Sequence, residues 1–511
     1  MITLLGDMGA IWYENNSAKL AGRARLFEGN TKPSAGGIWQ SIYNLAALKL
    51  GMLSNPFRGF GVAEKREKAL SSRAWFVVAE SCALSLVWPL PHSIALRNVL
   101  MAALLITLAF RADWQQAVRL IRGPARGLTA LYASFTLWIL VVALFISPFR
   151  GWSLGEISGQ WFCGFVAVLI GVITAFQKDV RIGPTIVVAV LGVLAVQVLA
   201  VDLQGIWVVA RTGAWSHMAR LGGLTAGPGK ASYLTNFLLS GLIAELSLRM
   251  EGRQGLSWAS AWVWGLVFAC VVSIYFEAMR NELFDVVVFV MFVGIIGYRI
   301  QARRAPRRAL LVVTGSLVAI LTAIGVDLVL DPRWQTLWAT IPVALDTTGH
   351  LAWLNGQRFS LPHLPNGQVV NPSNYLRIAW IKEGLKSVVA DPWGVGYGRS
   401  AFGHALRLRF GKMATTTGLN NSLITIAIGT GVPGVILWLG WFASIGKLAV
   451  SQFSGARAFE ARFLLLIVLA FGVRMGLDNE MQNYTLEQFL YFVGLLAPLA
   501  VISRGTGEQS G

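Results

Sequence analysis

The side chains of this sequence that could do chemistry are most concentrated between residues 328 and 418. Guanidinium and ammonium groups bind carboxylates and phosphates through charge-assisted hydrogen bonds, so an excess of them in one segment predicts an anionic ligand. A glycine-rich stretch, DPWGVGYGRSAFGH, lies at residues 391–404 of the same segment. The cations of the segment are Arg333, Arg358, Arg377, Lys382, Lys386, Arg399, Arg407, Arg409 and Lys412.

Gly394, Gly396 and Gly398 give the glycine-rich stretch access to positive φ angles. A backbone of that kind can bring its N–H groups close to an anion. The spacing matches neither the Walker nor the Rossmann phosphate-binding pattern, and a tight turn leading out of a helix would need the same glycines. The stretch therefore predicts either an anion-binding turn or a purely structural one.

These polar segments belong to a chain with the composition of a membrane protein. Of its 511 residues, 55% are hydrophobic and only 13% are charged, a balance that soluble domains do not tolerate. The net charge of +18 could suggest nucleic acid, but most Lys and Arg lie in short clusters between apolar runs. There they orient helices and meet anionic lipid headgroups, so we expect the lipid bilayer as a partner and no nucleic acid.

Apolar runs of membrane-spanning length predict an all-α polytopic fold with about twelve transmembrane helices. Between them, basic connections alternate with connections that are poor in Lys and Arg, so the positive-inside rule predicts that both termini are cytoplasmic. The runs begin near residues 74, 93, 127, 159, 183, 231, 258, 284, 309, 420, 463 and 486, and the basic connections are 111–126, 178–181, 249–253, 298–308 and 446–462. The predicted parts are an N-terminal segment 1–73, transmembrane helices 74–327, an outer loop 328–418 with amphipathic helices, transmembrane helices 419–504 and a cytoplasmic tail 505–511.

Four segments fall on the outer side in this topology: residues 202–230, the turn around Arg280, the loop 328–418 and residues 474–485. Within the loop, residues 371–392 predict an amphipathic helix with Asn374 as its cap and a stop at Asp391-Pro392. All the histidines of the chain map to this side, which polar residues avoiding lipid would also explain. They are His92, His217, His350, His363 and His404.

In residues 371–442, Arg and Trp on an amphipathic helix are followed by Asp-Pro, Gly-Val-Gly-Tyr-Gly, and an Asn-containing helix start with a Gly-Val-Pro-Gly kink site. This order of features resembles the O-antigen ligase and O-antigen polymerase family of bacterial inner-membrane glycosyltransferases, of the GT-C type. RLGGLTAGPGKASYL at 220–234 and FEAMRNEL at 276–283 are similar to two further family motifs. The resemblance implies a periplasmic active site that transfers a glycan from an undecaprenyl diphosphate-linked donor to a sugar hydroxyl.

The resemblance also implies roles for single residues. Arg280 and Arg377 match the arginines that hold the donor diphosphate, and Arg220 matches a third arginine near them. Permanently charged guanidinium groups stabilise the leaving oxygen without a metal ion. The outer segments contain no Asp-x-Asp pair and no cluster of metal-ligand side chains, so we expect neither a metal nor another cofactor. Arg399, Asn421 and Trp380 are expected to position the acceptor or the loop.

The general base is where this chain departs from the family. Family members commonly carry His-Asn at the outer start of the helix that here reads Asn420-Asn421, and Asn cannot take up a proton near neutral pH. Three explanations remain: a neighbouring side chain supplies the base, Asn420 only orients the acceptor, or this member has lost the reaction. The candidate bases are His404, Glu282, Asp478 and Glu480.

The sequence leaves the acceptor open. Lipid A-core as acceptor would make the protein an O-antigen ligase, whereas a growing lipid-linked glycan would make it a polymerase of O-antigen or exopolysaccharide. The alternative is a transporter or flippase in which the same basic residues bind an anionic amphiphile, and a catalytically inactive relative is the third possibility.

Overall fold

The computed structural model describes residues 70–213, 215, 220–302 and 305–502. The chain divides into Met1–Ala69 and Leu70–Gly511, and the structure below is that of the second unit. His217, residues 1–69 of the predicted N-terminal segment and the tail 505–511 lie outside the described residues. The regular elements of the described part are all helices. They are α3 (Ser72–Val87), α4 (Ile94–Ala109), α5 (Trp114–Arg122), α6 (Arg126–Val141), η1 (Val142–Ile146), α7 (Arg150–Glu156), η2 (Ile157–Trp161), α8 (Phe162–Ala175), α9 (Ile182–Thr212), α10 (Pro228–Met250), α11 (Ser260–Glu277), α12 (Arg280–Gln301), α13 (Pro306–Leu330), η4 (Pro332–Trp334), α14 (Leu337–Leu345), α15 (Pro372–Ala390), α16 (Ala401–Phe410), η5 (Gly411–Met413), α17 (Ser422–Ser451), α18 (Ala458–Leu477) and α19 (Asn483–Val501).

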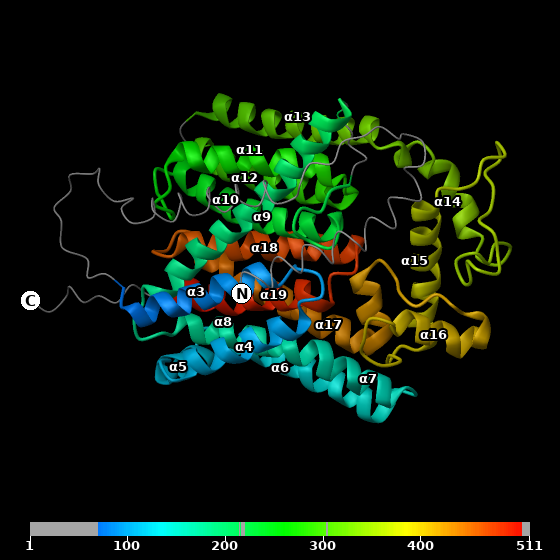
Figure 1. Cartoon of the computed structure of the whole chain (residues 1–511), viewed down its shortest axis with the longest axis horizontal. Coiled ribbons are helices and arrows are strands. Elements are labelled where there is room, and N and C mark those ends of the chain that lie inside the picture. The colour runs from blue at the N-terminus through cyan, green and yellow to red at the C-terminus, as the bar shows by residue number, and fades with distance from the viewer. Residues whose placement is uncertain (1–69, 214, 216–219, 303–304, 503–511) are drawn as a thin grey trace, which may run out of the picture. The chain divides into compact units, whose positions relative to one another are not determined.

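Every apolar run predicted to span the membrane coincides with a helix. Within the described residues, nine helices are long and apolar enough to cross a membrane, and the protein is therefore a multi-pass membrane protein. The other three predicted spans are α3 and α4, which are apolar but short, and α18, which carries Glu460, Arg462 and Arg474. All three pack into the helix bundle, α3 on α9, α4 on α8, and α18 on α10, α17 and α19 (Figure 1).

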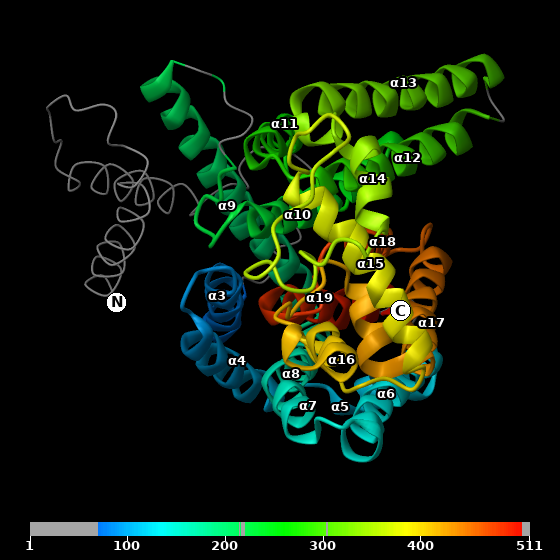
Figure 2. The ribbon, with the colours of Figure 1, turned by 90° about the vertical axis from the view of Figure 1, so that its right-hand side faces the viewer.

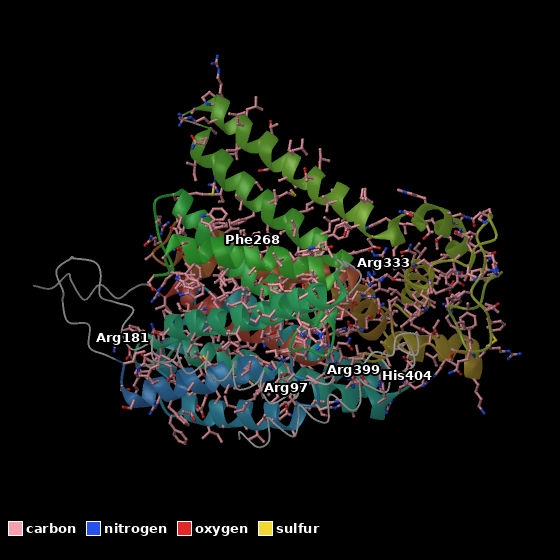
Figure 3. The ribbon with its side chains drawn as sticks, turned by 45° about the horizontal axis from the view of Figure 1, so that its top comes forward. Arg97, Arg181, Phe268, Arg333, Arg399 and His404 are labelled. Atoms are coloured by element: carbon pink, nitrogen blue, oxygen red, sulfur yellow. The ribbon has the colours of Figure 1, made fainter. Side chains whose placement is uncertain are left out.

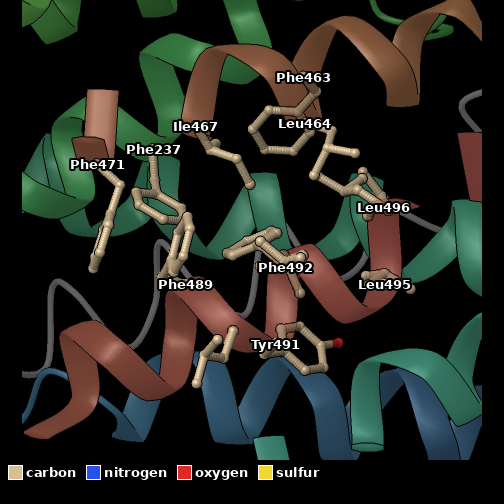
Figure 4. Close-up of a cluster of buried hydrophobic side chains, with 14 of the residues drawn as sticks. Phe237, Phe463, Leu464, Ile467, Phe471, Phe489, Tyr491, Phe492, Leu495 and Leu496 are labelled. Carbon is tan, nitrogen blue, oxygen red and sulfur yellow. The ribbon is translucent and has the colours of Figure 1, made fainter. Parts of the chain in front are cut away.

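The core of the bundle is formed around α10 and α19, whose apolar windows are almost wholly enclosed by other helices. Figure 4 shows aromatic side chains from α10, α18 and α19 interlocking there, and the rings of Phe471 and Phe489 stack at 3.9 Å. Gly171 on α8 and Gly494 on α19 lie against the backbone of the facing helix, so any side chain there would collide with it. Small residues of this kind matter because lipid offers no hydrophobic drive for two helices to associate, and close packing must supply it.

The helix connections gather at two opposite ends of the bundle. At one end the basic connections meet: the N–H of Asp113 donates to Phe176 O at 2.7 Å, and Arg253 Nη2 donates to Gly455 O at 2.6 Å. At the other end, hereafter the pocket end, the four segments predicted to share the outer side meet. Figure 2 looks onto this end, where α14, α15 and α16 lie in front of the spanning helices. Figure 3 shows Arg181 and Arg333 at opposite ends.

The predicted amphipathic helix at 371–392 is α15. Its N-cap is Asn371 rather than the predicted Asn374, because Pro372 occupies the first helical position and the Asn371 side chain accepts from the backbone N–H groups of Ser373 and Asn374. The Asn374 side chain does not cap the helix. Its Oδ1 accepts from Arg280 Nη1, and its Nδ2 donates to the backbone carbonyl of Arg333. Together with α14 and α16, α15 encloses a separate apolar cluster around Trp353.

The glycine-rich stretch docks into a break in α17. Gly431 has φ 71°, outside the helical range, and Pro433 has no N–H with which to satisfy the carbonyl of Gly429. The N–H of Gly396 donates to that carbonyl at 2.9 Å, and Val395 N–H donates to Ile428 O at 2.9 Å. Of the two alternatives predicted for this turn, the structural one applies to Val395 and Gly396, because the α17 backbone accepts the hydrogen bonds of both N–H groups.

Replacing Gly394 with alanine is expected to destabilise this docked loop. Its φ of 93° is strained for any residue with a Cβ, and the new atom would lie 2.6 Å from the carbonyl oxygen of Gly429. Strain of this kind costs about 1–3 kcal/mol before the steric clash is added. Gly418→Ala is the matched control, because no heavy atom lies within 4 Å of its Cβ position. Thermal unfolding in detergent compares the two variants, and equal melting temperatures would contradict the prediction.

Candidate functional site

A cavity of about 300 Å³ opens at the pocket end between four separate segments. They are the stretch before α10, the turn between α11 and α12, the exit of α13 with η4, and the start of α15. Among the described residues, its lining is rich in guanidinium and amide groups and contains no carboxylate. The lining residues are Arg220, Met279, Arg280, Asn281, Arg333, Asn371, Pro372, Ser373 and Arg377.

Arg280 is the first residue of α12, and the turn before it aims its side chain into the cavity. Ala278 closes α11 in the left-handed conformation, with φ 51°, so the chain reverses within two residues. Arg280 Nη1 donates to Asn374 Oδ1 at 2.8 Å and Nη2 donates to Ser373 Oγ at 3.2 Å. The guanidinium also lies over the Trp334 ring at 5.3 Å. Contacts on several sides hold Arg280 in one orientation.

Asp331 forms ion pairs with two of the cavity arginines, Arg280 and Arg333. It is fully buried, forms an ion pair with Arg333 at 2.5 Å, and lies 3.8 Å from Arg280. Burial raises the pKa of this carboxyl, but the hydrogen bonds from Arg333 outweigh it and hold the pKa below the usual value. Arg333 Nη2 also donates to Ala278 O at 3.1 Å, which ties η4 to the turn that carries Arg280.

Arg377 and Arg220 complete the cavity from two other elements. Arg377, in the first turns of α15, donates to Leu477 O at 3.0 Å through Nη1, while its buried Nε has no partner. Arg220 has a positive φ of 50° and is the most exposed of the four arginines, with Nη2 3.4 Å from Met279 Sδ. Partial burial and the nearby charge of Arg333 lower the pKa of Arg220.

The charges of the site do not balance. Arg220, Arg280, Arg333 and Arg377 line the cavity, and within the described part of the chain Asp331 is the carboxylate that forms ion pairs with them. Like charges held together in a partly enclosed space repel one another unless an anion joins them. The arrangement therefore suits a ligand with more than one negative charge, such as a diphosphate.

The structure brings the three sequence-predicted arginines, Arg220, Arg280 and Arg377, together in one cavity. Sequence reasoning placed Arg333 only among the loop cations and did not single out Asp331. The signal that could have found them is the Asp-Pro-Arg sequence directly after an apolar run, an acid and a base two residues apart at a helix exit.

Three other predicted residues lie away from the cavity. His404, on α16, packs on the rings of Phe149 and Trp152 at 4.4 and 4.0 Å, and burial together with Arg407 lowers its pKa. Arg399 forms an ion pair with Glu156 at 3.2 Å, and Figure 3 shows both Arg399 and His404 well separated from Arg333. The third is Trp380, whose Nε1 donates to Trp353 O at 2.9 Å. All three hold residues 328–418 together or against the bundle, and none lines the cavity.

Four further predicted residues do not line the cavity either: Asn421, Asn420, Glu282 and Glu480. Asn421 is the N-cap of α17: its side chain accepts from Ile424 N–H at 2.9 Å and donates to Gly476 O at 2.6 Å. Asn420 beside it is exposed and does not line the cavity. Glu282 is fully buried within the bundle, and Glu480 is buried against Arg474 at 2.9 Å.

Asp478 is the candidate base with a hydrogen bond to the cavity lining. Asn281, which lines the cavity next to Arg280, directs its Nδ2 toward Asp478 Oδ2 at 3.5 Å. Asp478 is half-buried at the exit of α18, and its other oxygen accepts from Asn479 N–H at 2.8 Å. Asp478 is therefore partly exposed and also hydrogen-bonded to a residue of the cavity lining. Among the described contacts, none of the other three candidate bases has both properties.

The cavity thus combines a cluster of guanidinium groups with a carboxylate at its edge, at one end of a membrane-spanning bundle. Its chemistry is that of a site for a multiply charged anion beside a proton acceptor. Comparison of the chain with protein-family models and with curated proteins finds no match.

Proposed function

We propose that the protein is a bacterial inner-membrane glycosyltransferase of the O-antigen ligase or polymerase type. It transfers a glycan from an undecaprenyl diphosphate-linked donor to a sugar hydroxyl at the periplasmic face, with both termini in the cytoplasm. One observation carries the proposal: Arg220, Arg280 and Arg377, from three separate segments, meet in one cationic cavity at the end of the bundle. A lipid-linked diphosphate is the ligand that needs both a membrane and a cluster of cations.

In the proposed reaction, the acceptor hydroxyl oxygen attacks C1 of the donor sugar. The bond between C1 and the diphosphate oxygen breaks, and its electron pair stays on the diphosphate. Arg280 and Arg377 would stabilise the negative charge that develops there, and Arg220 would hold the outer phosphate. The hydroxyl proton passes to a carboxylate, and the released product is the undecaprenyl diphosphate.

Asp478 is the base in this proposal. It lies at the edge of the cavity through its hydrogen bond to Asn281, whereas Asp331 is already paired with Arg333. A carboxylate bound by a guanidinium is a weaker proton acceptor than one that accepts from amide groups. The Asn420-Asn421 departure from the family would then be compensated by a residue from the neighbouring α18.

Replacing Asp478 with asparagine is expected to lower kcat by about 10²-fold or more, because the amide keeps the shape but cannot accept the proton. Donor affinity should change little, since the arginines remain. Asp346→Asn is the matched control, an exposed carboxylate at the end of α14. Steady-state transfer rates measure the effect, and wild-type kcat in Asp478→Asn would place the base elsewhere.

The direct test is transfer by the purified protein with chelator present. An undecaprenyl diphosphate-linked oligosaccharide is supplied with and without lipid A-core. Modified lipid A-core would identify a ligase, and a ladder of lengthened donor would identify a polymerase. An intact donor with every acceptor would contradict glycosyl transfer and favour an inactive relative or transport.

One observation favours a second candidate function, transport or flipping of an anionic amphiphile. Glu277, Glu282, Asp285 and Arg474 are all buried inside the bundle, on α11, α12 and α18. Ionisable residues within membrane helices are expensive and often mark a translocation path. Movement of a fluorescent lipid diphosphate across proteoliposomes, without any glycan transfer, would support this alternative.

A further inference from the structure

Three apolar residues of α15 are exposed on the side of the helix that does not pack on the protein. Ile381, Leu385 and Val389, spaced by four residues, are 37%, 53% and 82% exposed. In the C-terminal half of α15, the buried residues are small or polar: Glu383, Gly384 and Ser387. Gly384 is the close approach to α17, since a Cβ there would lie 2.7 Å from Ile424 Cγ2. The exposed apolar face, the α15 stripe, is defined by Ile381, Leu385 and Val389.

The α15 stripe continues into a surface that faces lipid. After α15 the chain reaches Trp393, which is 60% exposed and lines an apolar groove of about 540 Å³. The other wall of this groove is the flank of α17 after its break, including Val432 and Ile436, both exposed. Because α17 is a membrane-spanning helix, its exposed apolar flank lies against hydrocarbon. Through Trp393, the chain therefore leads directly from the stripe to this flank of α17.

The direction of α15 fits this continuity. Figures 1 and 2 show α15 crossing the end of the bundle, roughly at right angles to the spanning helices, which makes it parallel to the membrane plane. Lys382 and Lys386 flank the stripe, and their ammonium groups bind Leu345 O and Glu383. An apolar stripe bordered by lysines in a helix parallel to the membrane is the pattern of an interfacial helix.

We propose that α15 lies at the boundary between the headgroups and the hydrocarbon of the bilayer leaflet at the pocket end, with the α15 stripe inserted into the hydrocarbon. The occupant of the stripe and of the Trp393 groove is the acyl chains of membrane lipid. Arg377, near the start of the same helix, then lies at the depth of the lipid phosphates, because a helix parallel to the membrane keeps its two ends at similar depth.

This placement specifies how the ligand reaches the arginines. An anion carried by a lipid enters the cavity sideways, with its hydrocarbon still in the leaflet, whereas a soluble anion would approach from water. As far as it concerns the glycan donor, the inference rests on the proposed function. The interfacial position of α15 is independent of it.

The test measures the depth of single residues in reconstituted protein. Leu385→Cys and Val389→Cys are made in a background in which Cys82, Cys163 and Cys270 are replaced by alanine, and each is labelled with a small fluorophore. Lys412→Cys is the control, an exposed position of the same 328–418 segment. The proteins are placed in phosphatidylethanolamine–phosphatidylglycerol vesicles that contain doxyl-labelled lipid, and iodide serves as the aqueous quencher.

We expect doxyl lipid to quench the fluorophores at 385 and 389, and iodide to quench the one at 412. Quenching of positions 385 and 389 by iodide alone would overturn the proposal, because the stripe would then face water. Protection from both quenchers would also overturn it, since a second copy or another protein would then cover the stripe.

A second experiment measures activity in the double variant Leu385→Glu, Val389→Glu. Two charged side chains should keep the stripe from inserting into hydrocarbon. The KM for a long-chain polyprenyl diphosphate donor is expected to rise about tenfold, with no change for a water-soluble short-chain donor. Equal effects on both donors would contradict the inference. If the wild-type protein consumes neither donor, the proposed function fails, and the quenching measurement still decides the position of α15.

Discussion

Replacing Arg280 with alanine is expected to lower the rate of transfer from a lipid-diphosphate donor by about 10³-fold. Arg280 is held by Asn374 and Ser373 on one side and by the Asp331 charge on another, so its position is set before the donor arrives. Preorganised charge of this kind stabilises the transition state without reorganisation during the reaction. Arg358→Ala, which removes an exposed cation of the 328–418 segment, should leave the rate unchanged.

The substitution Arg280→Lys distinguishes two explanations for the role of this arginine. An arginine that only extends to the membrane surface could be replaced by lysine without effect, because lysine does the same. An arginine that grips a phosphate through two parallel hydrogen bonds cannot, because lysine offers a single point charge. We therefore expect Arg280→Lys to recover little of the lost kcat. Full activity of either variant would remove Arg280 from the proposed site.

Replacing Arg474 with leucine is expected to destabilise the folded protein by about 3–5 kcal/mol. Arg474 is 1% exposed inside the bundle, pairs with Glu480 at 2.9 Å and with Asp285 at 3.5 Å, and donates to Ser232 at 3.1 Å. Without the guanidinium, carboxylates in a dry interior lose their counter-charge. Because the whole stability of a folded protein is about 5–15 kcal/mol, the loss should be visible as reduced yield and a lower melting temperature.

A matched set of variants tests the origin of that loss. Arg307→Leu removes an exposed cation at the start of α13 and should change the melting temperature little. Adding Glu480→Leu and Asp285→Leu to Arg474→Leu should recover much of the stability, since replacing a whole buried charge network with apolar groups is often neutral. If Arg474→Leu and Arg307→Leu have the same melting temperature, the buried charge network does not stabilise the fold.

The helices and the membrane class were readable in the sequence because both depend on local composition. Without water inside the bilayer, a spanning segment must satisfy its own backbone, so a long apolar run becomes a helix wherever it occurs. The break in α17 was local in the same way, because Gly431 permits a non-helical φ and Pro433 lacks an N–H. The sequence did not decide between an anion-binding and a structural role for the glycine turn, because its hydrogen-bond partner, the α17 backbone, lies more than thirty residues further on.

The tertiary structure decided which polar groups meet. The three sequence-predicted arginines share a cavity because α11–α12, the stretch before α10 and α15 converge, and Asp331 adds Arg333 to them. Packing on Phe149 and Trp152 takes His404 elsewhere. The face by which a helix packs decides where its side chains point. Composition alone does not predict that face, because α15 leaves the apolar residues Ile381, Leu385 and Val389 exposed. Local chemistry sets which elements form, whereas contacts between residues far apart in the chain determine the site.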